Sequence, residues 1–355
     1  MKKIALALLP FILVFSFLLV SCSDKAILDE IEASDDDLKV VGSIGGKDIL
    51  YDELRCITAN YREVLANKYG EDIWDSDVTA AEHLPELERY VLSALKVNAA
   101  ALIAAERNGI SPDDKEIREY VKIELNKLSE ELVSEIKINS EIEDHSPSRK
   151  EINAAYVKYL KDYHLTDRYN RYTISVHGCV QQLLQKCVTD GTLSNDDEYI
   201  RKYIDDNFVR VLHIYIRNDS GESVDANRKL AEDALNQLRA GETTMKKLIG
   251  SKINDDHYLT TMHGYYFTRG EYFTAYEDSA YALEIGEYSD VVASQDGFYI
   301  IQRLELENDY INQIFETLKS QYHTSYVNGM IEDIKEEIEF TFNDYGKSLD
   351  LTKIN

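Results

Sequence analysis

The sequence predicts a mostly helical α+β protein with a small strand-containing region in its C-terminal half. Two runs there, 209–216 and 294–301, combine β-branched and aromatic residues over the length of a strand. Before residue 208 and after residue 308, apolar residues recur instead at the spacing of one helix face. The 355 residues are enough for about two domains.

The first 21 residues predict a processing signal rather than a folded element. Lys2 and Lys3 precede an apolar stretch that runs from residue 4 to residue 20. This stretch is about long enough to span a bilayer, so a retained membrane anchor is the alternative. The Leu-Val-Ser-Cys that follows, ending at Cys22, resembles a bacterial lipobox. The resemblance implies cleavage before Cys22, lipidation of that cysteine, and a lipoprotein held on the outer face of the cell membrane.

Residues 22–39 are acidic and weakly periodic, which predicts a solvated tether between the lipid and the fold. The formal net charge of −26 becomes −28 once Lys2 and Lys3 are removed. Such a charge argues against a phosphate-binding surface, so nucleic acid is not expected as a partner. It also argues against a body that lies flat on an anionic membrane.

Three further cysteines, Cys56, Cys179 and Cys187, cannot form a complete disulfide framework. Neither a Cys-x-x-Cys pair nor a histidine cluster accompanies them in the sequence, so no metal or cofactor is expected. We expect these cysteines to be small buried hydrophobic residues. The 25 tyrosines suit adaptable contacts with peptides, or belong to an ordinary core and surface.

The helical region from residue 40 to residue 207 opens with a strand, a Gly-Gly turn and a short strand. Helices are predicted next over 52–69 and 84–108, and Gly109 ends the second of them. The N-capping residues expected at four later helix starts are Ser111, Ser148, Thr166 and Ser194.

Two segments of this region resemble the N-terminal chaperone domain of SurA-like foldases. Residues 41–54 match its opening pattern through Gly46 and Leu54, and residues 106–117 match a second segment. Leu50 stands where the pattern has a capping threonine, and a leucine side chain cannot cap a helix. The resemblance implies a helical chaperone domain over residues 40–207.

Residues 208–307 resemble a parvulin-type peptidyl-prolyl isomerase domain. The first strand carries His213 within the family's strand motif, and residues 276–290 match a family segment closely. A helix predicted over 226–238 lies between the two strands, as in the family. The resemblance implies a small antiparallel sheet flanked by helices.

The end of the chain is predicted as one long helix over residues 310–342. In SurA-like and PrsA-like foldases, a C-terminal helix packs back on the chaperone domain. The resemblance therefore implies that residues 308–355 belong with the chaperone domain and that the parvulin-like domain is inserted before them.

The same resemblance implies the residues of a site. The catalytic residues would be His213, Asp255, Ser294 and Tyr299, and the proline pocket would be formed by Phe267, Tyr272 and Tyr276. Tyr299 stands where the family has its second histidine, and a phenol can still donate and accept a hydrogen bond. The residues alone leave structural roles open: His213 as a buried hydrogen-bonded histidine, Asp255 as a loop carboxylate, and the tyrosines as core packing.

Three functions remain open from the sequence. The first is an extracytoplasmic foldase that binds unfolded or secreted polypeptides, especially X–Pro segments, and isomerises the X–Pro bond. That reaction needs no nucleophile, metal or net proton transfer, because the barrier of about 18–20 kcal/mol comes from amide resonance. The second is a holdase chaperone with a degenerate parvulin-like module. The third is a lipoprotein assembly or adhesion subunit with one fixed partner.

Overall fold

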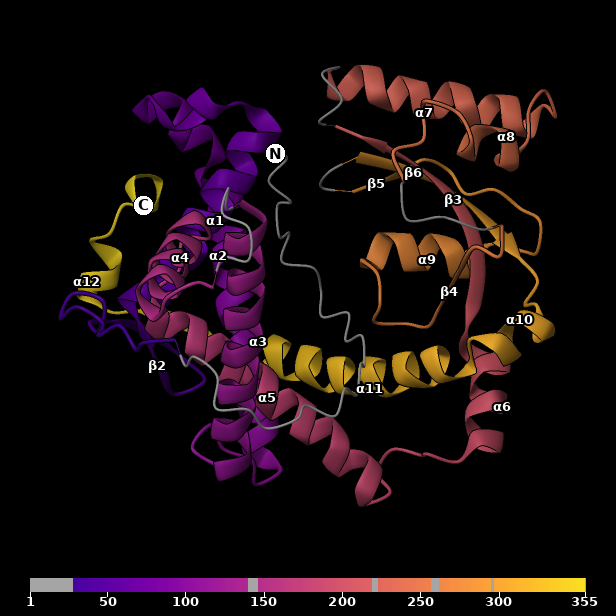
Figure 1. Cartoon of the computed structure of the whole chain (residues 1–355). Helices are drawn as coiled ribbons and strands as arrows, with labels where there is room; N and C mark the ends of the chain where they lie inside the picture. The colour runs from indigo at the N-terminus through magenta and orange to yellow at the C-terminus, as the bar shows by residue number, and fades with distance from the viewer. Residues whose placement is uncertain (1–27, 140–145, 219–222, 257–261, 295–296, 355) are drawn as a thin grey trace. The chain divides into compact units, whose positions relative to one another are not determined.

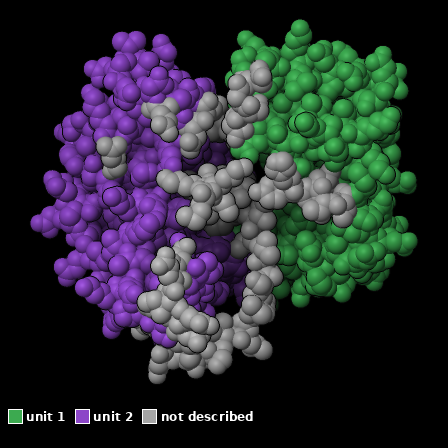
Figure 2. All heavy atoms as spheres, turned by 45° about the horizontal axis from the view of Figure 1, so that its top comes forward, with its two compact units in different colours: residues 1–16, 188–329 green, residues 17–187, 330–355 purple. Residues whose placement is uncertain are grey.

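A computed structural model describes residues 28–139, 146–218, 223–256, 262–294 and 297–354 (Figure 1). The chain divides into two compact units (Figure 2). In the described residues, unit 1 is 188–329, and unit 2 is 28–187 together with 330–354. The predicted signal of residues 1–21 and Cys22 lie outside the described residues. Within the part that is described, no helix is both long enough and apolar enough to cross a membrane.

Unit 2 contains a three-stranded antiparallel sheet that joins the beginning and the end of the chain. Its strands are β1 (Val40–Ile44), β2 (Lys47–Leu50) and β7 (Phe340–Phe342), in the order β2-β1-β7. Gly45 and Gly46 form the β1–β2 turn with φ of 55° and 82°, a left-handed conformation that glycine adopts without strain. The predicted strand-turn-strand is confirmed.

The helices of unit 2 follow this sheet in chain order. The main ones are α1 (Tyr51–Tyr69), α2 (Asp77–Arg107), α3 (Lys115–Asn139), α4 (Arg149–Asp162) and α5 (Asp167–Thr189). Three short pieces complete the unit: η1 (Glu71–Trp74), α12 (Asp344–Lys347) and η2 (Leu351–Lys353). The predicted helix over 84–108 is longer than expected, because it begins at Asp77 with Ser76 as its cap and accommodates Pro85 in its interior.

Two of the four predicted caps are confirmed. Ser148 accepts the Glu151 N–H at the start of α4, and Thr166 accepts the Tyr169 N–H at the start of α5. The other two predictions were wrong. A turn in which Asp114 accepts the Ser111 N–H delays α3 until Lys115.

The second incorrect cap lies before α6 (Asp197–Asn207), where Asp196, not Ser194, accepts the Tyr199 N–H at 2.8 Å. Ser194 instead accepts the Asp196 N–H, which fixes the residue that does cap the helix. An aspartate is as good an N-cap as serine, so the position nearer the helix is used.

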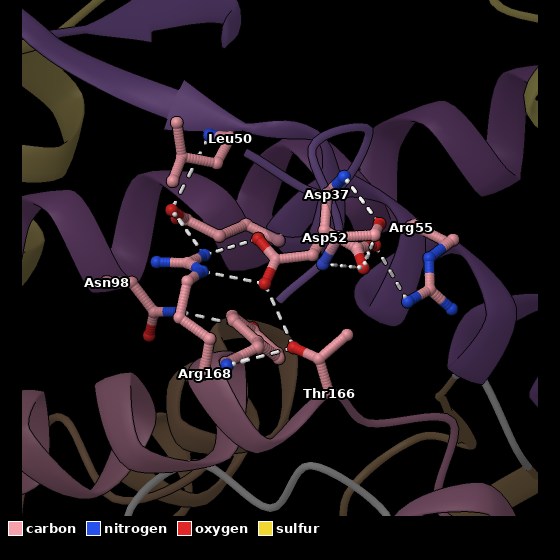
Figure 3. Close-up of polar contacts among 10 residues, drawn as sticks. Asp37, Leu50, Asp52, Arg55, Asn98, Thr166 and Arg168 are labelled. Atoms are coloured by element: carbon pink, nitrogen blue, oxygen red, sulfur yellow. Dashed lines mark hydrogen bonds and ion pairs between the residues drawn. The ribbon is translucent and has the colours of Figure 1, made fainter. Parts of the chain in front are cut away.

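The first turn of α1 is held by the carboxylate cluster, in which the buried Asp52 and Glu53 meet the part-buried Thr166 and Arg168. Figure 3 shows Asp52 between Thr166 and Arg168. Arg168 Nε and Thr166 Oγ1 donate to Asp52 Oδ2 at 2.7 and 2.9 Å. Arg168 Nη2 also donates to Glu53 Oε1 at 3.1 Å. Glu53 accepts the Leu50 N–H at 3.5 Å. In place of a capping side chain at Leu50, the backbone carbonyls of Lys39 and Asp37 accept the first two N–H groups of the helix, those of Tyr51 and Asp52, at 2.8 and 3.1 Å.

The described part of the predicted tether, residues 28–39, packs against unit 2. Leu28 is 2% exposed in a core cluster with Leu125 and Leu160. The Ile31 N–H donates to Asp167, and the Asp37 carboxylate pairs with Arg55 at 3.1 Å. Nine of these twelve residues are exposed, and Leu28 is the one that is buried. The acidic groups of the segment find hydrogen-bond and ion-pair partners, and Leu28 supplies apolar burial.

Unit 1 is built on a four-stranded antiparallel sheet in the order β4-β3-β6-β5. Its strands are β3 (Val209–Arg217), β4 (Tyr265–Phe267), β5 (Val292–Ala293) and β6 (Gly297–Leu304). β3 and β6 are the predicted pair, in a register that places His213 opposite Ile301. Three helices cover the two faces (Figure 1): α7 (Val224–Arg239) and α8 (Met245–Ile249) pack on one, and α9 (Thr274–Ala282) packs on the other.

The predicted long helix over 310–342 was wrong in its extent. The structure has α10 (Asn308–Gln313), α11 (Phe315–Glu337) and then β7. Phe340, Thr341 and Phe342 alternate apolar and polar, which is the period of a strand rather than a helix. The α+β class itself, a mostly helical chain with small antiparallel sheets, is confirmed.

Candidate active site

The site of unit 1 starts from the alternation of side chains along β3. Leu212 and Ile214 point to the α7–α8 face, while Val209 and Val211 point to the α9 face. Because successive side chains of a strand alternate, His213 falls on the α9 face. The histidine is 5% exposed, so its ring must find its hydrogen bonds inside the protein.

Both ring nitrogens of His213 have a partner. Nδ1 lies 2.7 Å from the hydroxyl of Tyr276 on α9. Nε2 lies 3.2 Å from Oδ2 of Asp256, in the segment that follows α8. The same Asp256 oxygen accepts the hydroxyl of Tyr265 on β4 at 2.6 Å. Residues from β3, β4, α9 and the α8–β4 connection therefore meet at one imidazole.

The Asp256 carboxylate is positioned by a short segment that extends along the edge of β3. The Tyr215 N–H donates to Asn254 Oδ1 at 3.0 Å, and the Asp255 N–H donates to the Tyr215 carbonyl at 2.7 Å. The Arg217 N–H then donates to Asp255 Oδ2 at 2.9 Å. Asp255 is thus turned toward the strand backbone, and Asp256, not the predicted Asp255, reaches His213.

Aromatic rings surround the imidazole. Tyr265 stacks on it with ring centroids 4.7 Å apart and planes 7° from parallel. Tyr299 meets it edge-on at 5.2 Å and 90°, and Tyr215 stacks on Tyr299 at 4.4 Å. Tyr299 therefore lies beside His213 as expected from the sequence, and its contact with the histidine is one of rings.

Of the three rings expected to form a proline pocket, two are buried. Phe267 and Tyr276 are each 0% exposed, so they pack in the core beneath the site and cannot contact a substrate directly. Tyr272 is half-buried and stacks on Tyr276 at 4.7 Å. The exposed aromatic surface next to His213 consists of Phe273 and the half-buried Tyr215, Tyr265, Tyr272 and Tyr299. Phe273 was not predicted.

The loop that carries Tyr272 is fixed by one buried carboxylate. Glu277 Oε1 accepts the backbone N–H groups of Gly270, Glu271 and Tyr272, each at 2.9 Å. Glu277 is 6% exposed and lies one residue after Tyr276 on α9. Three charge-assisted hydrogen bonds on one oxygen make this loop a rigid part of the site.

Ser294 takes part in the β5–β6 hairpin. Its N–H and its hydroxyl both donate to the Gly297 carbonyl, at 2.8 and 3.0 Å. The residues that sequence reasoning missed are Asp256, Tyr265 and Phe273. The paired aspartates at 255 and 256 were the available signal, but the sequence did not show which of the two faces the histidine.

Burial keeps the phenols of the site in their neutral form. It raises the pKa of Tyr265, and the hydrogen bond to Asp256 raises that pKa further. Burial likewise raises the pKa of Tyr272 and of Tyr276. Beside them, burial raises the pKa of Glu271 to about 7. At neutral pH the site therefore offers phenolic O–H donors and apolar rings.

Potential metal ligands are not grouped in the described residues, where no set of three His, Cys, Asp or Glu side chains could hold an ion. Cys56, Cys179 and Cys187 are buried, and none of them forms a disulfide with another described residue. Burial raises the pKa of the Cys56 and Cys179 thiols to about 11, so both are protonated at neutral pH and unreactive.

Comparison with known proteins decides the family of this domain. The family model of the PPIC-type peptidyl-prolyl isomerase domain, the rotamase family, matches residues 213–305. Residues 213–305 are a PPIC-type peptidyl-prolyl isomerase domain. The match begins at His213, within β3, and covers β6 and the aromatic site. The parvulin-type resemblance seen in the sequence is confirmed.

The similarity extends beyond the PPIC-type domain. The chain is 25% identical over 339 residues to foldase protein PrsA of Caldanaerobacter subterraneus subsp. tengcongensis, covering 90% of this chain and 89% of that protein. The crystal structure of foldase protein PrsA from Streptococcus pneumoniae is 15% identical, with 84% of this chain and 93% of that chain covered and a TM-score of 0.33. PrsA from Bacillus subtilis is 16% identical, with 88% and 94% covered and a TM-score of 0.25.

Proposed function

We propose that this protein is an extracytoplasmic foldase, tethered to the membrane, that binds unfolded secreted polypeptides and isomerises their X–Pro bonds. The observation that carries the proposal is the PPIC-type domain itself, with His213 held at the centre of an aromatic site. Similarity to foldase protein PrsA over 90% of this chain supports the wider role.

Isomerisation of an X–Pro bond requires a binding site of suitable shape and polarity, and no reactive group. Rotation about an X–Pro bond removes amide resonance, and a catalyst must bind the twisted amide better than either planar form. Tyr272, Phe273 and Tyr299 offer adjoining partly exposed rings that can hold a proline ring in apolar contact. His213 contacts Tyr299 and is hydrogen-bonded to Asp256, which also accepts the Tyr265 hydroxyl, so fixed polar groups adjoin these rings.

The tether is proposed from the lipobox-like sequence that ends at Cys22. A lipidated cysteine carries enough acyl chain to hold a soluble body at the membrane. Substituting Cys22→Ala is expected to release the protein from the membrane fraction. Unchanged membrane association of this variant would contradict a lipid tether.

A second candidate function is a holdase chaperone that does not catalyse isomerisation. It is favoured by the burial of His213, whose side chain is 6% exposed and whose two nitrogens are both engaged within the domain. Such a histidine can serve the fold alone. The aromatic surface would then bind polypeptide without lowering the rotation barrier.

A prolyl-peptide assay on the chain from Ser23 to Asn355 separates the two functions. We expect relaxation of an X–Pro peptide from cis-enriched to equilibrium composition to be faster than in buffer, and slower again with His213→Ala. A rate at the buffer level for both proteins would contradict the isomerase. If both then still suppress aggregation of an unfolded protein, the holdase is the function.

A further inference from the structure

Tyr276 carries a hydroxyl at a buried position where an apolar ring would be enough for core packing. Tyr276 is 0% exposed and packs in an apolar cluster with Val211, Phe267 and Ile301. A buried hydroxyl without a partner is unfavourable by about 1–3 kcal/mol, so a buried tyrosine needs a hydrogen bond. The bond that the structure provides is to His213 Nδ1, at 2.7 Å.

The partners of Asp256 determine where the protons lie. An ionised carboxylate only accepts hydrogen bonds, and Asp256 Oδ2 faces both the Tyr265 hydroxyl and His213 Nε2. His213 Nε2 must then carry a proton and donate a hydrogen bond to Asp256. In a neutral imidazole Nδ1 is left as an acceptor, and the Tyr276 hydroxyl is the donor that faces it.

We propose that Tyr276 is a positioning residue of the isomerase site, whose hydroxyl acts with Asp256 to hold His213 as the neutral Nε2–H tautomer in one ring orientation. This inference rests on the proposed isomerase function. Tyr276 does not reach the surface, so it acts through His213 and not on the substrate.

The ring contacts explain why the orientation matters. His213 stacks parallel to Tyr265 and stands perpendicular to Tyr299, a half-buried ring of the exposed aromatic surface. A half-turn of the imidazole about its Cβ–Cγ bond would keep the ring plane but replace both nitrogens by carbons, and so break both hydrogen bonds. A smaller rotation would break the ring contacts as well. A single donor at Nδ1 and a single acceptor at Nε2 therefore keep the surface rings in one arrangement, which a catalyst of fixed geometry requires.

The test compares Tyr276→Phe with a matched control on the same helix. Tyr281→Phe also removes one hydroxyl, which donates to the Asn207 carbonyl at 2.6 Å, and its ring packs on the same cluster without touching His213. The readouts are nitrogen NMR of the chain from Ser23 to Asn355 labelled at histidine, with His213 assigned by its substitution, and the pH profile of isomerisation.

In the unaltered chain we expect the His213 spectrum to show protonated Nε2 and unprotonated, hydrogen-bonded Nδ1. Tyr276→Phe is expected to move the Nδ1 resonance to that of a free lone pair, to lower kcat about 3–10-fold with little change in KM, and to displace the pH profile. Tyr281→Phe is expected to leave the His213 resonances and the pH profile unchanged.

Two results would overturn the inference. One is a protonated Nδ1 in the unaltered chain. The other is a Tyr276→Phe variant with unchanged His213 resonances and unchanged kcat. An unaltered chain without isomerase activity would instead remove the proposed function, and the NMR comparison would still decide whether Tyr276 and Asp256 set the tautomer.

Discussion

At the scale of single residues, His213 is held between a carboxylate and a hydroxyl, because Asp256 faces Nε2 and Tyr276 faces Nδ1. His213 and Tyr299 were identified in the sequence because strands β3 and β6 carry strong local patterns, and their rings lie 5.2 Å apart. Asp256 follows a connection with no such pattern. Asp255 accepts the Arg217 N–H while its neighbour Asp256 faces His213, so a shift of one residue in the alignment exchanges the two roles.

The first prediction separates these two aspartates. Asp256→Asn is expected to lower kcat/KM for an X–Pro peptide at least about tenfold, because it replaces a charged acceptor shared by His213 and Tyr265. Asp255→Asn is expected to change kcat/KM less than about threefold, since an amide oxygen can still accept the Arg217 N–H. The prolyl-peptide assay measures both, and a larger loss in Asp255→Asn would reverse the assignment.

At the scale of elements, capping residues predicted helix starts only where one side chain faced no competitor. Ser148 and Thr166 cap α4 and α5 as expected. Near α3 and α6, an aspartate two or three residues further on takes part in the turn and moves the start of the helix. At the start of α1 no capping side chain is present, and Glu53 accepts the Leu50 N–H from inside the helix.

A second prediction concerns the loop between β4 and α9. Glu277→Ala leaves three part-buried backbone N–H groups without their acceptor, so we expect a loss of about 1–3 kcal/mol in the free energy of unfolding. Urea unfolding followed by circular dichroism measures it. Glu277→Gln keeps one carbonyl acceptor and is expected to lose less; equal losses in both variants would show that the three hydrogen bonds are not responsible.

A third prediction follows from the carboxylate cluster of unit 2. Burial raises the pKa of Glu53 from its ordinary value of 4.5 to about 7, against the opposing effect of Arg168. The folded state therefore binds a proton that the unfolded state has released. Stability is highest below pH 4.5 as far as this group is concerned, and it falls by on the order of 1–3 kcal/mol as the pH rises to about 7.

Trp74 is the only tryptophan of the chain and lies in unit 2, so its fluorescence during urea unfolding measures this effect. Glu53→Gln cannot ionise and is expected to abolish the dependence between pH 4.5 and 7 that arises from this group. Parallel stability curves for the two proteins across that range would contradict a raised pKa of Glu53.

At the scale of the whole molecule, the sequence predicted the α+β class and the isomerase domain because several separate segments match one family in the same order. It did not show which contacts residues 28–39 make, because an acidic composition predicts solvation and does not identify partners. The partners of this segment, Arg55, Arg149 and Asn153, come from distant parts of the chain. Only the folded structure brings these groups together.

A fourth prediction tests how unit 2 depends on the end of the chain. Truncation after Ile338 removes β7, which pairs with β1, and the buried residues Leu351 and Ile354. We expect unfolding measured by Trp74 fluorescence to shift to lower urea concentration, because β1 loses one of its two neighbours. Isomerase activity measured at low temperature is expected to remain, since residues 213–305 are intact. An unchanged fluorescence transition would show that unit 2 does not need β7.

The central claim is that the site around His213 isomerises X–Pro bonds. Exchange NMR on an X–Pro peptide at equilibrium tests it most directly, because it measures the cis–trans rate without a coupled reaction. With a catalytic amount of the chain from Ser23 to Asn355, we predict exchange cross-peaks between the cis and trans resonances. The exchange rate obtained from their intensities is expected to be at least about tenfold lower with His213→Ala. An exchange time that stays at the uncatalysed value of tens to hundreds of seconds, although the unaltered chain is present and folded, would contradict the account.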